Sequence, residues 1–97
     1  MDNNRKRRLQ NCVRTLRYVN DCLGRCGGPK SSIILVGKAV TDLEDRLKKA
    51  DDEAQSSTDT CTNLAMAAGL LKQENSAVTD PYGVLIVAAI PVILENW

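Results

Sequence analysis

The sequence predicts an all-α protein, a bundle of three to four helices that forms one domain over residues 1–97. Apolar residues recur at alternating spacings of three and four, which places one apolar stripe along a helix. The only aromatic residues are Tyr18, Tyr82 and Trp97, and Phe is absent. The core material is therefore Leu, Val, Ile and Ala, which suits helix-on-helix packing more than a β-sandwich.

The central segment, residues 31–78, carries the longest run of this spacing and has the pattern of a coiled coil. Its seam consists of Ile33, Val36, Val40, Leu43, Leu47, Ala50, Ala54, Ser57, Cys61, Leu64, Ala68, Leu71, Asn75 and Val78. The unbroken seam, with no Gly or Pro near Ser57, favours one long helix. The similar lengths of four separate segments favour a turn near Ser57 and a compact up-down bundle.

Residues 3–24 are predicted to form a basic amphipathic helix. Its apolar stripe is Leu9, Cys12, Val13, Leu16, Val19 and Leu23, with Arg14 and Arg17 opposite. Gly24, Gly27, Gly28 and Pro29 are expected to end it, because Gly accepts a left-handed conformation and Pro cannot continue a helix. Ser31 or Ser32 is the predicted cap of the next helix.

The second helix should reach at least Ala54. Three acid-before-base pairs at i,i+4 support it: Asp42 with Arg46, Glu44 with Lys48, and Asp45 with Lys49. If the chain turns near Ser57, then Ser57, Thr58 or Asp59 is expected to cap a third helix.

The C-terminal segment, about residues 80–94, is the most apolar part of the chain. Thr79 is a predicted cap with Pro81 in the first turn, and residues 82–94 carry no charge. We expect a helix that ends near Pro91, with a strand as the alternative. The run is too short to span a bilayer. We expect it to close the core; docking of a protein partner and shallow insertion into a membrane are the alternatives.

Charge is distributed unevenly. Residues 1–30 hold eight Lys and Arg against two Asp, whereas residues 31–97 hold five against ten Asp and Glu. The basic first helix is therefore expected to lie against an acidic later segment of its own or a sister chain. Alternatively, an anionic partner such as a nucleic acid or lipid headgroups contacts the basic cluster Arg5, Lys6, Arg7 and Arg8.

Residues able to support catalysis or metal binding are few. The chain has no His, the usual acid–base residue, so we expect no enzymatic activity, no cofactor and no small-molecule substrate. Cys22 and Cys26 lie four residues apart without a second close pair, so no zinc site is expected. The N-terminus lacks an apolar signal region, which predicts a cytoplasmic or nuclear protein with reduced thiols. The even count of four Cys keeps a disulfide as the alternative.

These patterns predict a non-enzymatic helical assembly or adaptor module. It would associate with itself, as a homo-oligomer, or bind another helical protein. The residues expected to form that contact are Val36, Val40, Leu43, Leu47, Leu64, Leu71, Val84 and Ile86. The alternatives are a nucleic-acid-binding protein that uses the basic helix and a membrane-active bundle that uses the C-terminal segment. The mixed seam does not specify an oligomer number.

Overall fold

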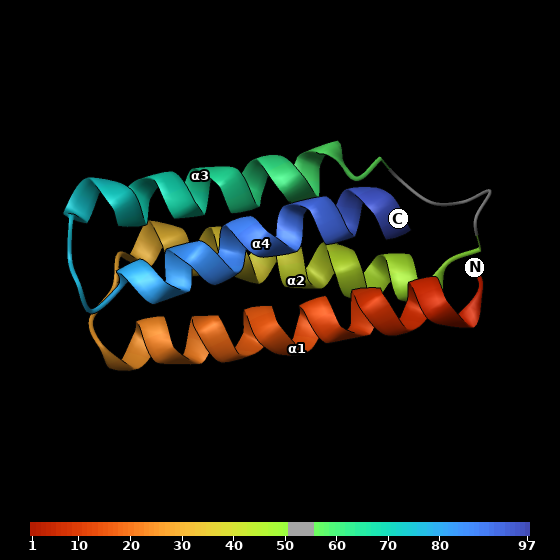
Figure 1. Ribbon diagram of the computed structural model, residues 1–97, viewed down its shortest axis with the longest axis horizontal. Coiled ribbons are helices and arrows are strands. Elements are labelled where there is room, and N and C mark those ends of the chain that lie inside the picture. The colour runs from red at the N-terminus through yellow and green to blue at the C-terminus, as the bar shows by residue number, and fades with distance from the viewer. Residues whose placement is uncertain (51–55) are drawn as a thin grey trace.

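The computed structural model, which describes residues 1–50 and 56–97, is an all-α bundle. Within these residues the helices are α1 (Asn3–Arg25), α2 (Lys30–Lys48), α3 (Thr58–Glu74) and α4 (Asp80–Asn96). Each helix packs against two neighbours: α1 and α3 both contact α2 and α4 (Figure 1). The predicted fold class is therefore confirmed.

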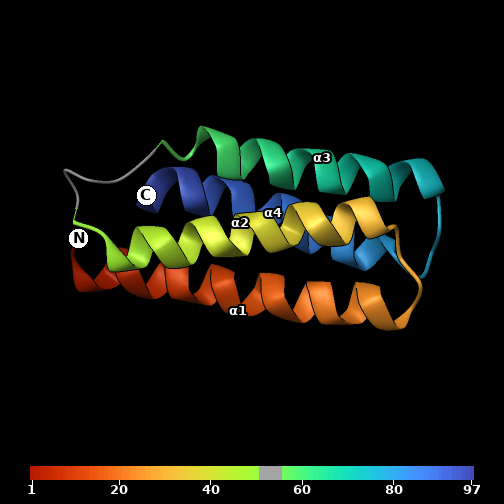
Figure 2. The same cartoon turned by 180° about the vertical axis from the view of Figure 1, so that it is seen from behind.

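The helices alternate in direction and form an elongated bundle of 40 × 19 × 19 Å. In Figure 1, α4 lies in front, with α3 above it and α1 below it, and Figure 2 shows α2 on the opposite side. Both termini lie at the end of the bundle where α2 ends and α3 begins. In this arrangement α4 has one face toward the core and one face outward, flanked by two helices.

The core is made mainly of branched aliphatic side chains. The predicted stripe of α1 is buried as expected, from Leu9 to Leu23. The largest fully buried apolar side chains are Leu9, Leu16, Leu23, Leu43, Leu64, Leu71, Ile86 and Ile93. Full burial of such a side chain is worth roughly 1.5–3 kcal/mol relative to exposure, so these contacts hold the four helices together.

The chain turns between α2 and α3, and the single long helix is excluded. Helix α2 ends at Lys48, and Lys49 is extended at φ −91° and ψ 154°. The expectation that this helix reaches Ala54 is wrong at Lys49 and Ala50; Ala54 itself lies outside the described residues. Folding back lets Leu64 and Leu71 enter the core beside Leu43. Tertiary burial therefore outweighs the continuity of the seam.

Helix α1 begins and ends with backbone-specific signals. The Asp2 carboxylate accepts a hydrogen bond from the Arg5 backbone N–H at 2.8 Å and so caps the first turn. The helix passes Gly24 and ends at Arg25. Gly27 then adopts φ +75°, and the Gly28 N–H bonds to the Leu23 carbonyl at 2.8 Å. This is the bond of a Schellman motif, which needs a left-handed residue before it.

The predicted caps at Ser31 and Ser32 are wrong, because both residues lie inside α2. Pro29 occupies the N-cap position and makes no side-chain cap bond. The Ser32 hydroxyl is fully buried and donates instead to the Ala67 carbonyl of α3 at 3.0 Å. Serine is common at helix caps, but the Ser32 side chain is used here for a hydrogen bond between α2 and α3.

Ser57 and Thr79 do occupy the N-cap positions of α3 and α4, but neither side chain makes a cap bond. Thr79 instead donates its hydroxyl hydrogen to the Ser76 carbonyl at 3.3 Å. The expected helix end near Pro91 is wrong, since α4 continues to Asn96. Pro91 lies on the exposed side of α4, where water can reach the carbonyl that loses its intrahelical donor.

Candidate protein-binding surface

Helix α4 is apolar on both faces. Ile86, Ala89 and Ile93 point into the core. On the opposite face Val84, Val87 and Leu94 remain 68%, 53% and 57% exposed. No charged residue occurs between positions 82 and 94. Single exposed aliphatic residues are common, but a contiguous apolar face is typical of an interaction site.

Two grooves border this face, one on each side of α4. The groove between α3 and α4 has a volume of about 560 Å³ and is lined by Ala68, Leu71, Lys72, Asp80, Gly83, Val84, Val87 and Ala88. The groove between α1 and α4 has a volume of about 360 Å³ and is lined by Arg8, Asn11, Cys12, Thr15, Leu85, Ala88, Ala89 and Val92. Ala88 lines both grooves. We call the two grooves together with Val84, Leu85, Val87, Ala88, Pro91 and Leu94 the α4 surface.

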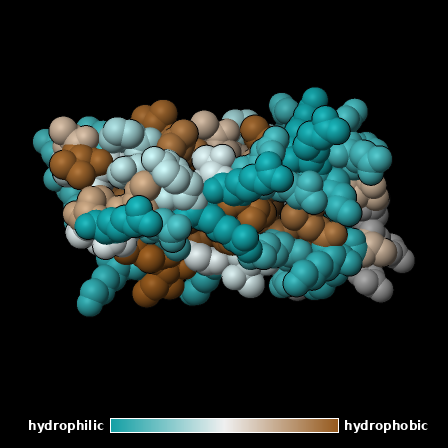
Figure 3. All heavy atoms as spheres, turned by 90° about the horizontal axis from the view of Figure 1, so that it is seen from below, coloured by the Kyte–Doolittle hydropathy of each residue, from teal (hydrophilic) through white to brown (hydrophobic). Residues whose placement is uncertain are grey.

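The α1 edge of the α4 surface is polar and basic. The Arg8 guanidinium donates to the Asn96 side-chain oxygen at 3.4 Å, across the α1–α4 groove. Arg7 and Arg14 are exposed on the neighbouring stripe of α1. Figure 3 views the bundle from the side of α1: hydrophilic residues cover the end that holds the N-terminus, and hydrophobic residues show between them.

The residues predicted to form the contact are mostly internal. Val36, Val40, Leu43, Leu64, Leu71 and Ile86 are buried in the core of this chain, and Leu47 is half-buried. Val84 alone among the eight is exposed. Self-association through the seams stays a prediction. Four of the exposed large hydrophobic residues, Val84, Leu85, Val87 and Leu94, lie together on α4, whereas Tyr18, Ile34, Met66 and Val78 are exposed singly elsewhere. Sequence reasoning missed Val87 and Leu94, although a helix without charges over thirteen residues has more than one apolar stripe.

The basic cluster lies at the start of α1. Lys6, Arg7 and Arg8 are exposed and Arg5 is half-buried. Further along, Arg17 pairs with Glu44 of α2 at 2.5 Å. This contact joins the basic helix to a later acidic residue, as expected, and it replaces the predicted pairing of Glu44 with Lys48. Both side chains are well exposed, so the pair is worth only about 0–1 kcal/mol.

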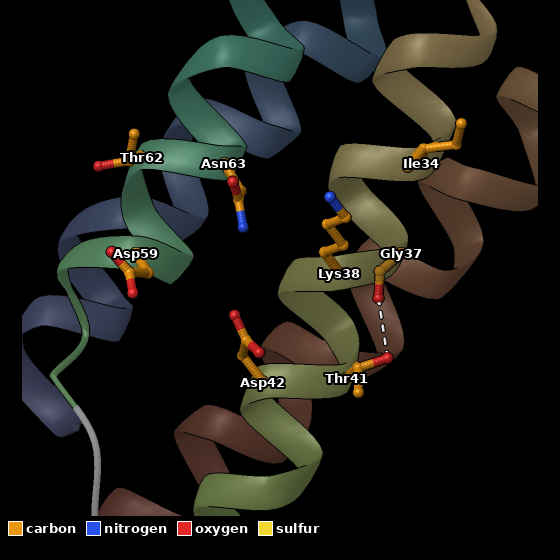
Figure 4. Close-up of a pocket in the computed structure, with 8 residues that line it drawn as sticks. All are labelled: Ile34, Gly37, Lys38, Thr41, Asp42, Asp59, Thr62 and Asn63. Carbon is orange, nitrogen blue, oxygen red and sulfur yellow. Dashed lines mark hydrogen bonds between the residues drawn. The ribbon is translucent and has the colours of Figure 1, made fainter.

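A polar groove of about 740 Å³ separates the outer edges of α2 and α3 (Figure 4). Lys38 and Asn63 point toward the gap, whereas Thr62 points away from it. The Asp42 carboxylate accepts a hydrogen bond from the Thr60 hydroxyl at 3.3 Å. Thr60 is only 1% exposed, so this hydroxyl is closed to a substrate and the bond serves to join the helices.

The four cysteines are free thiols in different surroundings. Cys12 is buried, Cys22 and Cys61 are half-buried, and Cys26 is exposed. Interaction with the nearby Cys22 thiol raises the pKa of Tyr18 and of Tyr82. Burial raises the pKa of Cys12 and of Cys61. The described residues contain no cluster of three or more side chains able to hold a metal ion.

This difference predicts selective alkylation by iodoacetamide at about pH 8. Cys26 should react at least about tenfold faster than Cys12, because the thiolate is the reactive form and burial raises the Cys12 pKa while blocking access. Peptide mass spectrometry over a time course measures both rates. In concentrated urea the difference should disappear. Equal rates in native buffer would mean that the α1–α4 contact over Cys12 opens readily.

Over the described part of the chain, no helix combines the length and apolarity needed to cross a membrane. Comparison with protein-family models, curated proteins and solved structures gives no match to this chain.

Proposed function

We propose that this protein is a non-enzymatic helical adaptor that binds a helix of another protein on its α4 surface. The observation that supports this most is the outward face of α4, where Val84, Val87 and Leu94 stay more than half exposed beside a complete core. Removing aliphatic side chains of this kind from water supplies roughly 1.5–3 kcal/mol each when burial is full. Burial of this face by a partner would therefore lower the free energy.

The shape of the α4 surface suits a helix. Side chains of a docking helix form ridges that pack into grooves of its partner. Here one groove lies on each side of α4, and Ala88 borders both. A small residue between two grooves lets a second helix approach closely.

The proposal can be tested with a synthetic amphipathic peptide of about 20 residues, long enough to be helical alone. Its apolar face is Leu and its flanking positions are Gln; a peptide of the same composition with a scrambled apolar face is the control. Fluorescence anisotropy should show binding of the first peptide only. Val87→Lys should weaken that binding by at least about tenfold, since a charge would be buried in the contact.

Ile34→Lys is the matched control variant, because Ile34 is 59% exposed on α2, away from the α4 surface. It should leave binding unchanged. Equal binding of the scrambled peptide would overturn the proposal. So would a dimer in light scattering that Val87→Lys converts to a monomer, because a second copy would then occupy the surface.

A further inference from the structure

We infer that the partner helix carries acidic residues along the edge that lies against α1. This rests on the proposed function and specifies the chemistry of the partner. The basis is three arginines of α1. Arg8 lines the α1–α4 groove, and Arg7 and Arg14 are exposed on the adjoining outward stripe of the same helix. We call these three residues the arginine row.

Helical geometry places Arg8 in the groove, and it places Arg7 and Arg14 on the stripe next to it. Arg8 lines the α1–α4 groove together with Asn11. Arg7 and Arg14 lie four residues before and three residues after Asn11, so Arg7, Asn11 and Arg14 share one stripe of α1, which lies outward of Arg8. At ~1.5 Å per residue, Arg7 and Arg14 are separated by about 10 Å along the helix. Carboxylates two turns apart on a partner helix have the same spacing.

The arginine row has no ion-pair partner within the described ranges 1–50 and 56–97. The Arg8 guanidinium contacts a neutral amide, that of Asn96, at 3.4 Å. Arg17 differs, since Glu44 already neutralises it. An incoming carboxylate therefore does not have to displace a carboxylate of the described residues from the row.

Among the residues that the structure describes, acidic side chains are scarce along this positive edge. Helix α1 has no Asp or Glu between Asn3 and Asn20, and α4 has no charge between positions 82 and 94. The carboxylates of α4 lie near its two ends, at Asp80 and Glu95. The opposite groove is different, because Lys72 and Asp80 line it together. The asymmetry selects a partner whose acidic flank faces α1.

A grooved aliphatic surface fits a helix better than a bilayer or a nucleic acid. The exposed α4 side chains Val84, Val87 and Leu94 include no aromatic ring to sit among lipid headgroups or to stack on bases. Opposite charges across such an interface raise the association rate and exclude wrongly charged partners.

The experiment uses three peptides with one Leu face and with Glu, Gln or Lys along one flank. At about 50 mM salt the Glu peptide should bind at least about tenfold tighter than the Lys peptide, and by about 500 mM salt the difference should shrink to about threefold or less. The triple variant Arg7→Gln, Arg8→Gln, Arg14→Gln should lose the preference but keep its affinity for the Gln peptide.

Lys30→Gln, Lys38→Gln, Lys48→Gln is the matched control, since it removes the same charge from exposed positions on α2. It should keep the preference for the Glu peptide. Circular dichroism establishes that both triple variants are folded.

Three results decide between this inference and the proposed function on which it rests. If all three peptides bind equally and Val87→Lys still weakens their binding, the inference of an acidic flank is wrong, and the proposal that the α4 surface binds a helix is retained. If none of the peptides binds, both are wrong. If the arginine row instead controls binding to poly(U) RNA or to phosphatidylglycerol vesicles while the peptides show no preference, the cations serve a different partner and the inference is overturned.

Discussion

Replacing Ile86 with Asp should unfold the protein, whereas the same change at the next residue, Val87, should leave it folded. The Ile86 side chain is fully buried in the core, and Val87 is 53% exposed. Ile86→Asp removes buried aliphatic volume, which alone costs about 2–5 kcal/mol when Ala is the replacement, and it adds a buried carboxylate without a partner. That sum is comparable to the whole stability of a small domain, about 5–15 kcal/mol.

Circular dichroism at increasing urea concentration measures both variants. Val87→Asp should change the free energy of unfolding by no more than about 0.5 kcal/mol, as for other surface substitutions. It should nevertheless abolish binding of the Leu-faced peptide with Gln flanks. If Ile86→Asp retains a cooperative transition near that of the parent protein, the inner face of α4 does not close the core as described.

The fold follows largely from the spacing of apolar residues. The stripe from Leu9 to Leu23 and the seam residues Val36, Leu43 and Leu64 are buried where the three-four pattern places them. These positions are predictable because a helix with one narrow apolar stripe can bury it in a bundle only by turning that stripe toward the core. The helix boundaries are less predictable than the buried positions. The ends of α2 and α4 depend on the free energy gained by tertiary packing, and the local sequence at Lys49 and Pro91 does not indicate that gain.

The candidate site was only partly predictable. The seam indicates which residues are apolar, but not whether they face their own chain or another one. In this structure most large apolar seam residues face their own core, and the exposed apolar residues that lie together on one helix face belong to α4. Sequence alone could not divide α4 into an inner and an outer face, since Ile86 and Val87 are both β-branched, uncharged and adjacent. Only the packing against α1 and α3 separates them.

Arg46 also acquires its role from tertiary structure. The sequence pattern assigned it to an i,i+4 pair with Asp42. In the bundle it is 3% exposed. Its Nε donates to the Trp97 carbonyl at 2.7 Å, and its Nη2 donates to the same oxygen. Trp97 is the C-cap residue of α4, so a cation of α2 lies at the negative end of the α4 dipole. The two helices are not direct neighbours, and Arg46 links them across the end of the bundle.

Arg46→Ala should therefore lower the free energy of unfolding by about 3 kcal/mol. Hydrogen bonds to a charged group contribute about 1.5–3 kcal/mol, and the aliphatic stem of Arg adds packing that Ala lacks. Arg46→Met keeps most of the stem and removes the hydrogen-bond donors. Its free energy of unfolding should therefore lie between that of Arg46→Ala and that of the parent protein. Urea unfolding measures all three.

Arg14→Ala is the matched control, because Arg14 is exposed and makes no ion pair among the described residues. It should change stability by no more than about 0.5 kcal/mol. If Arg46→Met is as stable as the parent protein, the bonds to Trp97 contribute nothing net, and only the stem of Arg46 matters. If Met is as damaging as Ala, the guanidinium carries the effect, and the end of α4 is held to α2 by charge-assisted hydrogen bonds.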